Sequence, residues 1–399
     1  MPADAQCYHG LMRIYLDYNA TAPPLPEVVE AVSQAMAGIP GNASSVHTFG
    51  QQAKAALDTA RTEVARLLGA EASEIVFTSG GTEADNLAIR GAAEALEQAG
   101  RRHLVTTAIE HEAVLNTMRA LERRGWEVTF VPVDASGVVS ADAVAKAIRP
   151  DTALVSVMHA NNEIGTLQPI EEIAKHVRGS GALLHTDAVQ SAGKVPIDVK
   201  ALGVDLLSIS AHKFGGPKGT GALWIRRGVR LFSQMTGGRQ ERGRRAGTEN
   251  VPALVGMGVA ARIAARRVAT GLGDIAALRD RLESGILTAV PGTVVNGDPA
   301  RRVPNTTNIS FDGIEAESLL IALDLEGVAI STGSACSSGS LEPSHVLRAM
   351  GLPQPRTRNS LRFSLGPSTT KADVDFVVGV LPKLVSRLRQ LGRPAVAGR

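Results

Sequence analysis

The sequence predicts an α/β fold in which a large domain with a mostly parallel sheet is followed by a smaller α+β domain. Strand-like and helix-like segments alternate from about residue 50 to residue 225, which is typical of a parallel sheet covered by helices on both faces. After about residue 251 the alternation stops, and two long helical stretches lead into a mixed pattern. A chain of 399 residues is long enough for two such domains.

The elements of the first part follow from their apolar spacing. Apolar residues recur at helical spacing over residues 51–68, and a short apolar strand at 75–77 precedes two glycines and a helix through Leu87 and Ala88. Further strands are predicted at 104–107, 128–133, 154–158, 182–185, 205–209 and 222–225. Helices are predicted between them at 112–123, 141–148 and 170–177, the second with Ser140 as its N-cap.

The second part begins with two helices, predicted at 252–269 and 275–289. Strands then follow at 294–296, 305–311, 329–331 and 361–365, and helices at 316–325, 344–350 and 373–391. We therefore expect a large domain over 13–262 and a small domain over 263–391. Residues before about 22 are expected to pack with the small domain, and 392–399 to form a mobile tail.

Composition excludes several classes of function. The net charge is only +3 and aromatic residues are 3% of the chain, which argues against direct nucleic-acid binding. No apolar run approaches the roughly 18 residues of a membrane span, and the start of the chain lacks a signal-peptide pattern. Two cysteines, Cys7 and Cys336, cannot form a disulfide framework, so a cytoplasmic location is predicted. The histidines and cysteines show no metal-ligand spacing, and no metal site is predicted.

The most informative segment is residues 204–219. An apolar run ends in Ser210-Ala211-His212-Lys213, and a glycine-rich loop follows. This pattern places a lysine amine at the end of a buried strand, beside donors suited to a phosphate. Such a lysine can form a Schiff base with a carbonyl cofactor, and pyridoxal phosphate (PLP) also carries a phosphate. Taken alone, the pattern is equally compatible with a surface lysine that follows a strand.

Four more polar motifs follow predicted strands. Gly80-Gly81-Thr82 opens a helix and suits a phosphate, although it could be a plain turn. Asp187 could neutralise a pyridinium nitrogen and Gln190 could reach a phenolic oxygen, although Asp187 could equally be a helix cap. Asn161-Asn162 offers amides but could be an Asn-rich turn, and His111 could be structural. Because ligands of such sheets bind beyond the carboxyl ends of the strands, we interpret the motifs together as one site.

These motifs resemble those of the PLP-dependent cysteine desulfurases in the class V aminotransferase family, which supply sulfur for iron–sulfur cluster and nitrogenase maturation. The resemblance runs from YLDYNAT at 15–21 to SLRFSLG at 360–366. ERGRRAGTEN at 241–250 and GSACSSGSLEPS at 333–344 are highly specific to that family. The resemblance implies PLP fold type I, like aspartate aminotransferase. Residues 1–11 precede the start expected from the family, so Met12 is an alternative start.

The resemblance also implies roles for the matching residues. Lys213 would bind PLP covalently, Asp187 would hold the pyridine nitrogen protonated, and His111 would stack on the ring and move protons. Gln190 and Asn162 would hold the ring oxygen and the substrate. The phosphate would be bound by Gly81, Thr82, Ser210 and His212, with Ala211 also at the cofactor.

Two further roles concern the partner subunit and the substrate. Thr248 would reach the phosphate of the partner subunit, which implies a homodimer. Arg362 would clamp the carboxylate of L-cysteine in a bidentate pair.

Cys336 would carry the chemistry particular to these enzymes. A thiolate there would take the sulfur of L-cysteine as a persulfide, with alanine released. Five serines between Ser331 and Ser340 suit a mobile loop, whereas a lone free cysteine is more often buried and structural. The loop resembles the longer type, which hands sulfur directly to a scaffold protein. Cys336 could also ligate a nascent iron–sulfur cluster transiently.

Two other functions are considered beside the desulfurase. The chain could be another PLP enzyme of the same fold, such as a selenocysteine lyase or a transaminase, but a transaminase has no use for a mobile thiol at Cys336. It could also be an inactive docking platform for sulfur carriers, which the intact Lys213, His111, Asp187 and Arg362 argue against. The acceptor of the sulfur is open among general cluster assembly, nitrogenase maturation, tRNA thiolation and DNA modification.

Overall fold

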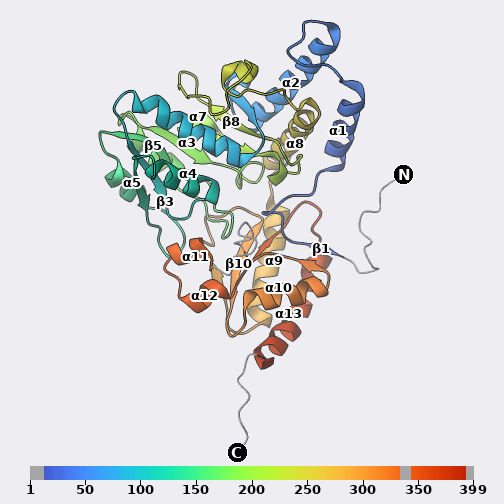
Figure 1. Ribbon diagram of the computed structural model, residues 1–399. Coiled ribbons are helices and arrows are strands. Elements are labelled where there is room, and N and C mark those ends of the chain that lie inside the picture. Colours follow the sequence, from blue (N-terminus) through green and yellow to red (C-terminus); the bar gives the residue numbers. More distant parts are fainter. Residues whose placement is uncertain (1–12, 333–342, 392–399) are drawn as a thin grey trace, which may run out of the picture.

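The computed structural model describes residues 13–332 and 343–391. It has a larger part built on a seven-stranded sheet and a smaller part built on a three-stranded sheet, seen above and below one another in Figure 1. The predicted tail at 392–399 and the predicted loop around Cys336 lie outside the described residues, as does Cys7.

The sheet of the larger part has the order β2-β8-β7-β6-β5-β3-β4. All neighbouring strands are parallel except the two pairs that include β8. The bounds are β2 (Ile75–Thr78), β3 (His103–Thr107), β4 (Glu127–Val131), β5 (Thr152–Ser156), β6 (Leu183–Asp187), β7 (Leu206–Ser210) and β8 (Gly221–Ile225). Because β8 is antiparallel to both its neighbours, the carboxyl end of β2 lies at the same edge as those of β3 to β7.

Helices cover both faces of this sheet. They are α1 (Pro26–Gly38), α2 (Thr48–Leu67), α3 (Gly81–Glu97), α4 (Glu112–Glu122), α5 (Ala141–Ala147), α6 (Ile170–Val177), α7 (Val199–Leu202) and α8 (Val251–Thr270). Successive strand residues point to opposite faces, so Leu104 belongs to the apolar cluster that includes α3 and α4, while Val105 belongs to the cluster of the other face, which includes α2 and α6. Because both faces of the sheet are buried, the strands are continuous apolar runs in the sequence.

The smaller part has an antiparallel sheet in the order β12-β10-β9. Its strands are β9 (Thr293–Asn296), β10 (Thr306–Phe311) and β12 (Ser360–Ser364), and β1 (Ile14–Tyr15) pairs separately with β11 (Val328–Ala329). Its helices are α9 (Gly273–Ala289), α10 (Ala316–Leu325), α11 (His345–Ala349), α12 (Gln354–Arg358) and α13 (Lys371–Leu391). Helix α8 runs unbroken through the predicted boundary at residue 262, and the boundary itself stays a prediction.

Residues 16–22, here named the crossover segment, carry the chain from the smaller part to the larger one. At one end the Leu16 carbonyl accepts a hydrogen bond from the Ser364 N–H, at 2.8 Å. At the other end the Ala22 N–H donates to the His212 carbonyl, also at 2.8 Å. The segment therefore lies between β12 and the residues that follow β7.

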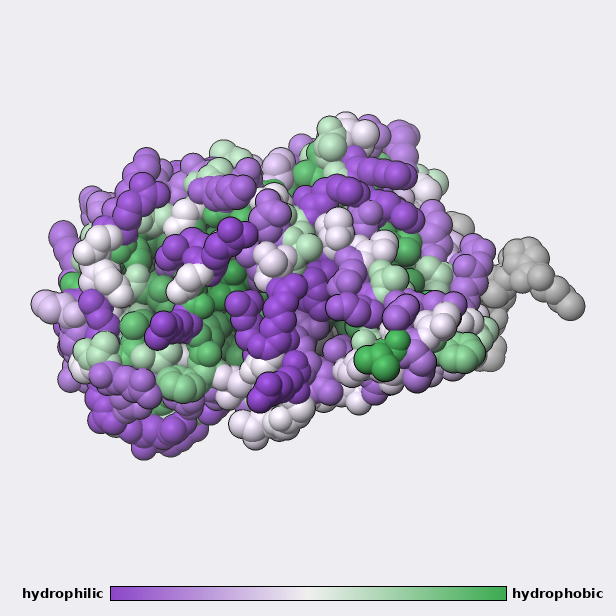
Figure 2. All heavy atoms as spheres, turned by 90° about the horizontal axis from the view of Figure 1, so that it is seen from above, coloured by the Kyte–Doolittle hydropathy of each residue, from purple (hydrophilic) through white to green (hydrophobic). Residues whose placement is uncertain are grey.

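Hydrophilic and hydrophobic residues are mixed on the outer surface of the larger part. Seen from above in Figure 2, the larger part is mostly hydrophilic, with hydrophobic residues visible in a hollow near its middle. Within the described residues no helix is long and apolar enough to cross a lipid bilayer.

Candidate active site

The candidate active site lies where the carboxyl ends of the parallel strands meet the crossover segment. Lys213 ends the 3₁₀ helix η2 (Ala211–Lys213), directly after β7. Its Nζ donates to the carbonyl oxygens of Asn19, at 2.6 Å, and Ala20, at 2.9 Å. The amine is thus held at the sheet edge by the crossover segment.

Asp187, the last residue of the neighbouring strand β6, and Gln190, which follows that strand, lie beside this amine. Asp187 is buried, and its Oδ1 accepts from the Val189 N–H at 2.8 Å. Burial raises the pKa of Asp187 to about 6, although the charge of Lys213 acts against that shift. Gln190 donates from Nε2 to the Asn19 carbonyl at 2.9 Å. A cationic N–H near Asp187 would stabilise its carboxylate.

The amino end of α3 forms a cradle against the end of β7. A Cβ atom added at Gly81 would lie 2.7 Å from Val189 Cγ2 and 3.5 Å from Ser210 Cβ. A Cβ atom added at Gly221, which begins β8, would lie 2.6 Å from the backbone carbonyl carbon of Gly80. These glycines leave the backbone N–H groups of a helix start accessible, which is the geometry that binds phosphate. Thr82 is exposed in the first turn of α3, and Ala211 is fully buried.

His212 and His111 are both neutral at ordinary pH. Burial and the nearby charge of Lys213 lower the pKa of each to about 4. His111 is the N-cap of α4, and its Nδ1 accepts from the Ala113 N–H at 3.1 Å. The neutral ring therefore carries its proton on Nε2. The ring of His212 contacts the Thr21 hydroxyl at 3.1 Å.

The two adjacent asparagines differ in their surroundings. Asn161 is buried and makes the hydrogen bonds of a turn, accepting from Glu163 and Ile164, so the alternative of an Asn-rich turn holds for Asn161. The side chain of Asn162 has no hydrogen-bond partner among the described residues, while its carbonyl accepts from Arg362 Nη1 at 3.0 Å.

Arg362 reaches the site from β12 of the smaller part. Its Nη2 pairs with Asp17 Oδ1 at 2.7 Å, and its Nε has no partner among the residues that the structure describes. Arg362 is 2% exposed, so this N–H is available only to a ligand that enters the site.

One predicted site residue, Thr248, is not brought to this cluster. Thr248 is exposed, in the loop between the 3₁₀ helix η3 (Gln240–Gly243) and α8. Arg245 of the same loop pairs with Glu83, in the first turn of α3, at 2.8 Å. Cys336 lies outside the described residues.

Sequence reasoning missed Asn19, which is 1% exposed and touches both parts. Its Nδ2 donates to the Asn162 carbonyl, at 3.2 Å, and to Thr306 Oγ1, at 2.9 Å. Its Oδ1 accepts from Lys194 Nζ at 2.7 Å and from Asn305 Nδ2 at 3.2 Å. The YLDYNAT motif contains Asn19, but nothing local indicates this role.

Lys194 was missed for the same reason. Its Nζ also donates to Gln190 Oε1 at 2.8 Å, so the Gln190 amide is oriented with its N–H groups toward Asn19. Burial lowers the pKa of Lys194 well below its usual value.

Glu110 is a third buried group next to the site. Its Oε1 accepts from Thr107 Oγ1, at 2.6 Å, and from the Met158 N–H, at 2.9 Å. Its Oε2 has no partner among the described residues, and burial raises its pKa to about 8. Glu110 therefore joins the ends of β3 and β5 as an uncharged acid at neutral pH.

The family model described as "Aminotransferase class-V" matches residues 14–377 of this chain. The chain belongs to this family. Its relatives include the protein named "Cysteine desulfurase" of Trichormus azollae, 53% identical over 378 residues, which cover 95% of this chain and 94% of the relative. "Cysteine desulfurase IscS" of Methanosarcina thermophila is 51% identical over 378 residues, covering 95% and 93%.

Solved structures of the class-V family match in three dimensions as well. A NifS-like protein has a TM-score of 0.89 at 38% identity, covering 94% of this chain and 100% of that one. DndA from Streptomyces lividans has a TM-score of 0.75 at 42% identity, covering 86% and 97%. The prediction of an α/β fold, of the class known as PLP fold type I, is confirmed.

Class-V desulfurases use PLP, and the described residues fit that cofactor. The cradle at Gly81 and Ser210 suits its phosphate. The buried carboxyl of Asp187 keeps Oδ2 for a ring N–H, and Lys213 lies within the same cluster. Three or more His, Cys, Asp or Glu side chains do not gather into a metal site anywhere in 13–332 or 343–391.

Replacing Glu110 by Gln should change how stability depends on pH. The folded protein keeps this carboxyl protonated up to about pH 8, whereas the unfolded chain ionises it above about 4.5. Its stabilising contribution is thus complete below 4.5 and lost as pH rises through 8. Relative to wild type, Glu110→Gln should gain up to about 1.4 kcal/mol of unfolding free energy per pH unit across that window.

Urea unfolding of the PLP-free protein over this pH range measures the effect. Glu112 is exposed and lies two residues further along the chain, so Glu112→Gln is the matched control. Its unfolding free energy should depend on pH as that of the wild type does. If the unfolding free energy of Glu110→Gln depended on pH as that of the wild type does, Glu110 would be ionised in the folded protein. Its assignment as a neutral acid would then be wrong.

Proposed function

We propose that this chain is a cysteine desulfurase, which takes sulfur from L-cysteine, releases L-alanine and passes the sulfur to an acceptor protein. The observation that carries the proposal is that Lys213, its neighbours Asp187 and His111, and Arg362 gather beside the crossover segment, in a chain whose relatives over 95% of its length are named cysteine desulfurase. PLP, when bound, supplies an electron sink for negative charge on the substrate carbon.

Arg362 and Asn162 are proposed to bind the substrate. The buried Nε of Arg362 offers an N–H to the carboxylate of L-cysteine, while Asp17 and the Asn162 carbonyl fix the plane of the guanidinium. A charge-assisted hydrogen bond from a guanidinium held this way is strong and directional. The free side-chain amide of Asn162 lies next to the same group.

His111 is proposed to move protons at the site. The Ala113 N–H fixes Nδ1 as an acceptor, so the neutral ring presents its proton from Nε2. With a pKa of about 4, the ring stays neutral through the physiological range and avoids charge repulsion with Lys213. His111 can therefore hold a proton at Nε2 and deliver it to a neighbouring basic atom.

Cys336 is proposed to receive the sulfur. Its thiolate attacks the substrate sulfur, so that an S–S bond forms and the Cβ–S bond of the substrate breaks. The electron pair of that bond stays on carbon, which takes up a proton and becomes the methyl group of alanine.

The anchors of the segment that contains Cys336 support this role. Ser331, before the segment, exchanges backbone hydrogen bonds with Arg362, at 2.7 and 3.3 Å. Ser344, after it, donates to Glu163, the residue that follows Asn162, at 2.6 Å. Both ends of the segment are thus attached beside the proposed substrate residues.

The acceptor is proposed to be an iron–sulfur scaffold protein, as the IscS and NifS names of the relatives suggest. Cys336 would then be able to ligate a nascent cluster transiently. The proposed location is the cytoplasm, where a reducing environment keeps such a thiol free.

The chain is also proposed to form a homodimer in which Thr248 reaches the cofactor phosphate of the partner subunit. Glu241 and Arg242 adopt left-handed backbone angles, with φ of 48° and 60°, which is strained for such residues. A buried, two-pronged ion pair from Arg61 to Glu241, with contacts of 2.6 and 2.7 Å, holds them there. The loop is therefore fixed while Thr248 itself is exposed.

Exposed apolar side chains in two regions of the larger part support the same interface. Phe232 and Met235 of the loop region are 43% and 44% exposed, and Val46 and Phe49 at the start of α2 are 89% and 57% exposed. Apolar side chains gathered on one surface commonly mark a protein interface.

A double substitution, Phe49→Asp with Met235→Asp, should convert the dimer into a monomer that holds PLP weakly, because the phosphate would lose Thr248. Sedimentation velocity and PLP content after dialysis measure both effects. Leu325→Asp, at a position 75% exposed on α10 of the smaller part, is the control and should stay dimeric. A monomer that retained PLP and full activity would refute the proposed role of Thr248.

The function itself is tested by Cys336→Ser. The variant should bind PLP and L-cysteine normally, but alanine production should fall to near background, because a hydroxyl is a far weaker sulfur nucleophile than a thiolate. Mass spectrometry of wild type after brief exposure to L-cysteine should find one extra sulfur on the Cys336 peptide, removable by a reductant. Cys7→Ser is the control and should behave as wild type. Alanine release at the wild-type rate from Cys336→Ser would exclude the desulfurase mechanism.

A further inference from the structure

A pocket of about 180 Å³ borders the crossover segment and Lys213, whereas His111 and Asp187 do not line it. Its walls come from four regions: Ala22 to Pro26, the residues around Lys194 and Lys213, the end of α8, and the smaller part from Leu272, Ile275 and Leu365. The pocket therefore spans the junction between the two parts. Its volume exceeds the roughly 150 Å³ of a cavity that can hold a benzene molecule.

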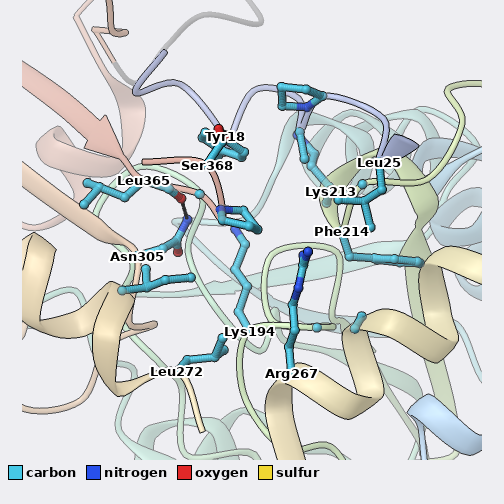
Figure 3. A pocket seen from close by; sticks show the side chains of 18 of the residues that line it. Tyr18, Leu25, Lys194, Lys213, Phe214, Arg267, Leu272, Asn305, Leu365 and Ser368 are labelled. Atoms are coloured by element: carbon cyan, nitrogen blue, oxygen red, sulfur yellow. Dashed lines mark hydrogen bonds between the residues drawn. The ribbon is translucent and has the colours of Figure 1, made fainter. Parts of the chain in front are cut away.

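The lining combines apolar side chains with cations. Leu25, Phe214 and Leu272 supply apolar surface, whereas Lys194 and Arg267 point into the space between them (Figure 3). No described residue that lines the pocket carries a carboxylate. The pocket is thus largely apolar, and none of its own lining residues neutralises the positive charge of Arg267.

Arg267 is the distinctive group of the pocket. It lies in the last turn of α8 and is half-buried, yet its guanidinium makes no hydrogen bond or ion pair with any residue in 13–332 or 343–391. Half-buried guanidinium groups normally have an anionic or carbonyl partner, because their desolvation is otherwise uncompensated. A planar guanidinium is complementary to a carboxylate, which it can bind with two parallel hydrogen bonds.

We propose that this pocket binds a small apolar monocarboxylate, with its carboxylate on Arg267 and its hydrocarbon among Leu25, Phe214 and Leu272. Lys194 also lines the pocket, and its Nζ donates to Asn19 Oδ1 and Gln190 Oε1. A ligand here would touch both parts of the molecule and the segment that carries Lys213. Because Arg362 and Asn162 do not line the pocket, the ligand would border Lys213 without occupying the proposed substrate-binding residues, and it would bias the arrangement of the two parts.

The PLP-loaded enzyme and 4-fluorophenylacetate, followed by fluorine NMR, test this proposal. We expect saturable binding to wild type that is at least tenfold weaker in Arg267→Met, because the charge-assisted pair is lost. The neutral probe 4-fluorophenylacetamide should bind wild type as weakly as it binds Arg267→Met. Arg266→Met, the exposed neighbour on α8, is the control and should bind the acid like wild type.

Folding of Arg267→Met is checked independently, since the residue has no partner to lose and its melting temperature should be unchanged or higher. The product L-alanine should not displace the acid if the pocket is separate from the Arg362 site. Displacement by L-alanine, with equal binding to wild type and Arg267→Met, would place the probe in the substrate site and overturn the proposal. Binding confined to a monomeric form would mean that a second copy covers the pocket, and would overturn it too.

Discussion

The hydrogen bonds around Asn19 are the constraint on which the site depends. A single buried residue bonds to β10 and β12 of the smaller part and, in the larger part, to the residues that follow β5, β6 and β7. Buried polar groups of this kind are stabilising only when all of them are satisfied at once. The positions of Lys213 and Gln190 are therefore tied to the docking of the smaller part, which also brings Arg362 into the site.

Burial sets the charge states within this network. It keeps His111, His159 and His185 neutral by lowering the pKa of each, and it raises the pKa of Asp187 and Glu110. Lys213 and Arg362 then supply positive charge at one place. A site with few anions and shielded cations suits a substrate and a cofactor that both bring negative charge.

Much of this organisation could be predicted from the sequence because it is local. The alternation of strands and helices predicted the parallel sheet. That topology brings the polar residues at the strand ends, such as Asp187 and His111, to one edge of the sheet. Helix α1 (Pro26–Gly38) was missed, and only two of its residues, Val28 and Ala35, are buried.

The unpredicted features are those that depend on contacts distant in sequence. Asn19 meets Thr306 and Ser364, Arg362 meets Asp17, and Arg61 meets Glu241; no spacing within one segment reveals such pairs. The sequence around Lys194 does not distinguish it from an exposed lysine, because its contact with Asn19 of the crossover segment is distant in sequence. The chemistry of Cys336 rests on the family resemblance and on the anchors at Ser331 and Ser344.

The most direct test of this account is the PLP dissociation constant of Asn19→Ala, measured together with the unfolding free energy of the PLP-free protein. The substitution deprives Lys194, Asn305 and Thr306 of partners, and each buried group left unsatisfied costs about 1–3 kcal/mol. We predict clearly weaker PLP binding and a loss of more than about 2 kcal/mol in stability. Asn116→Ala, exposed on α4, should change stability by no more than about 0.5 kcal/mol. If Asn19→Ala bound PLP and unfolded like wild type, the crossover segment would not be what assembles the site.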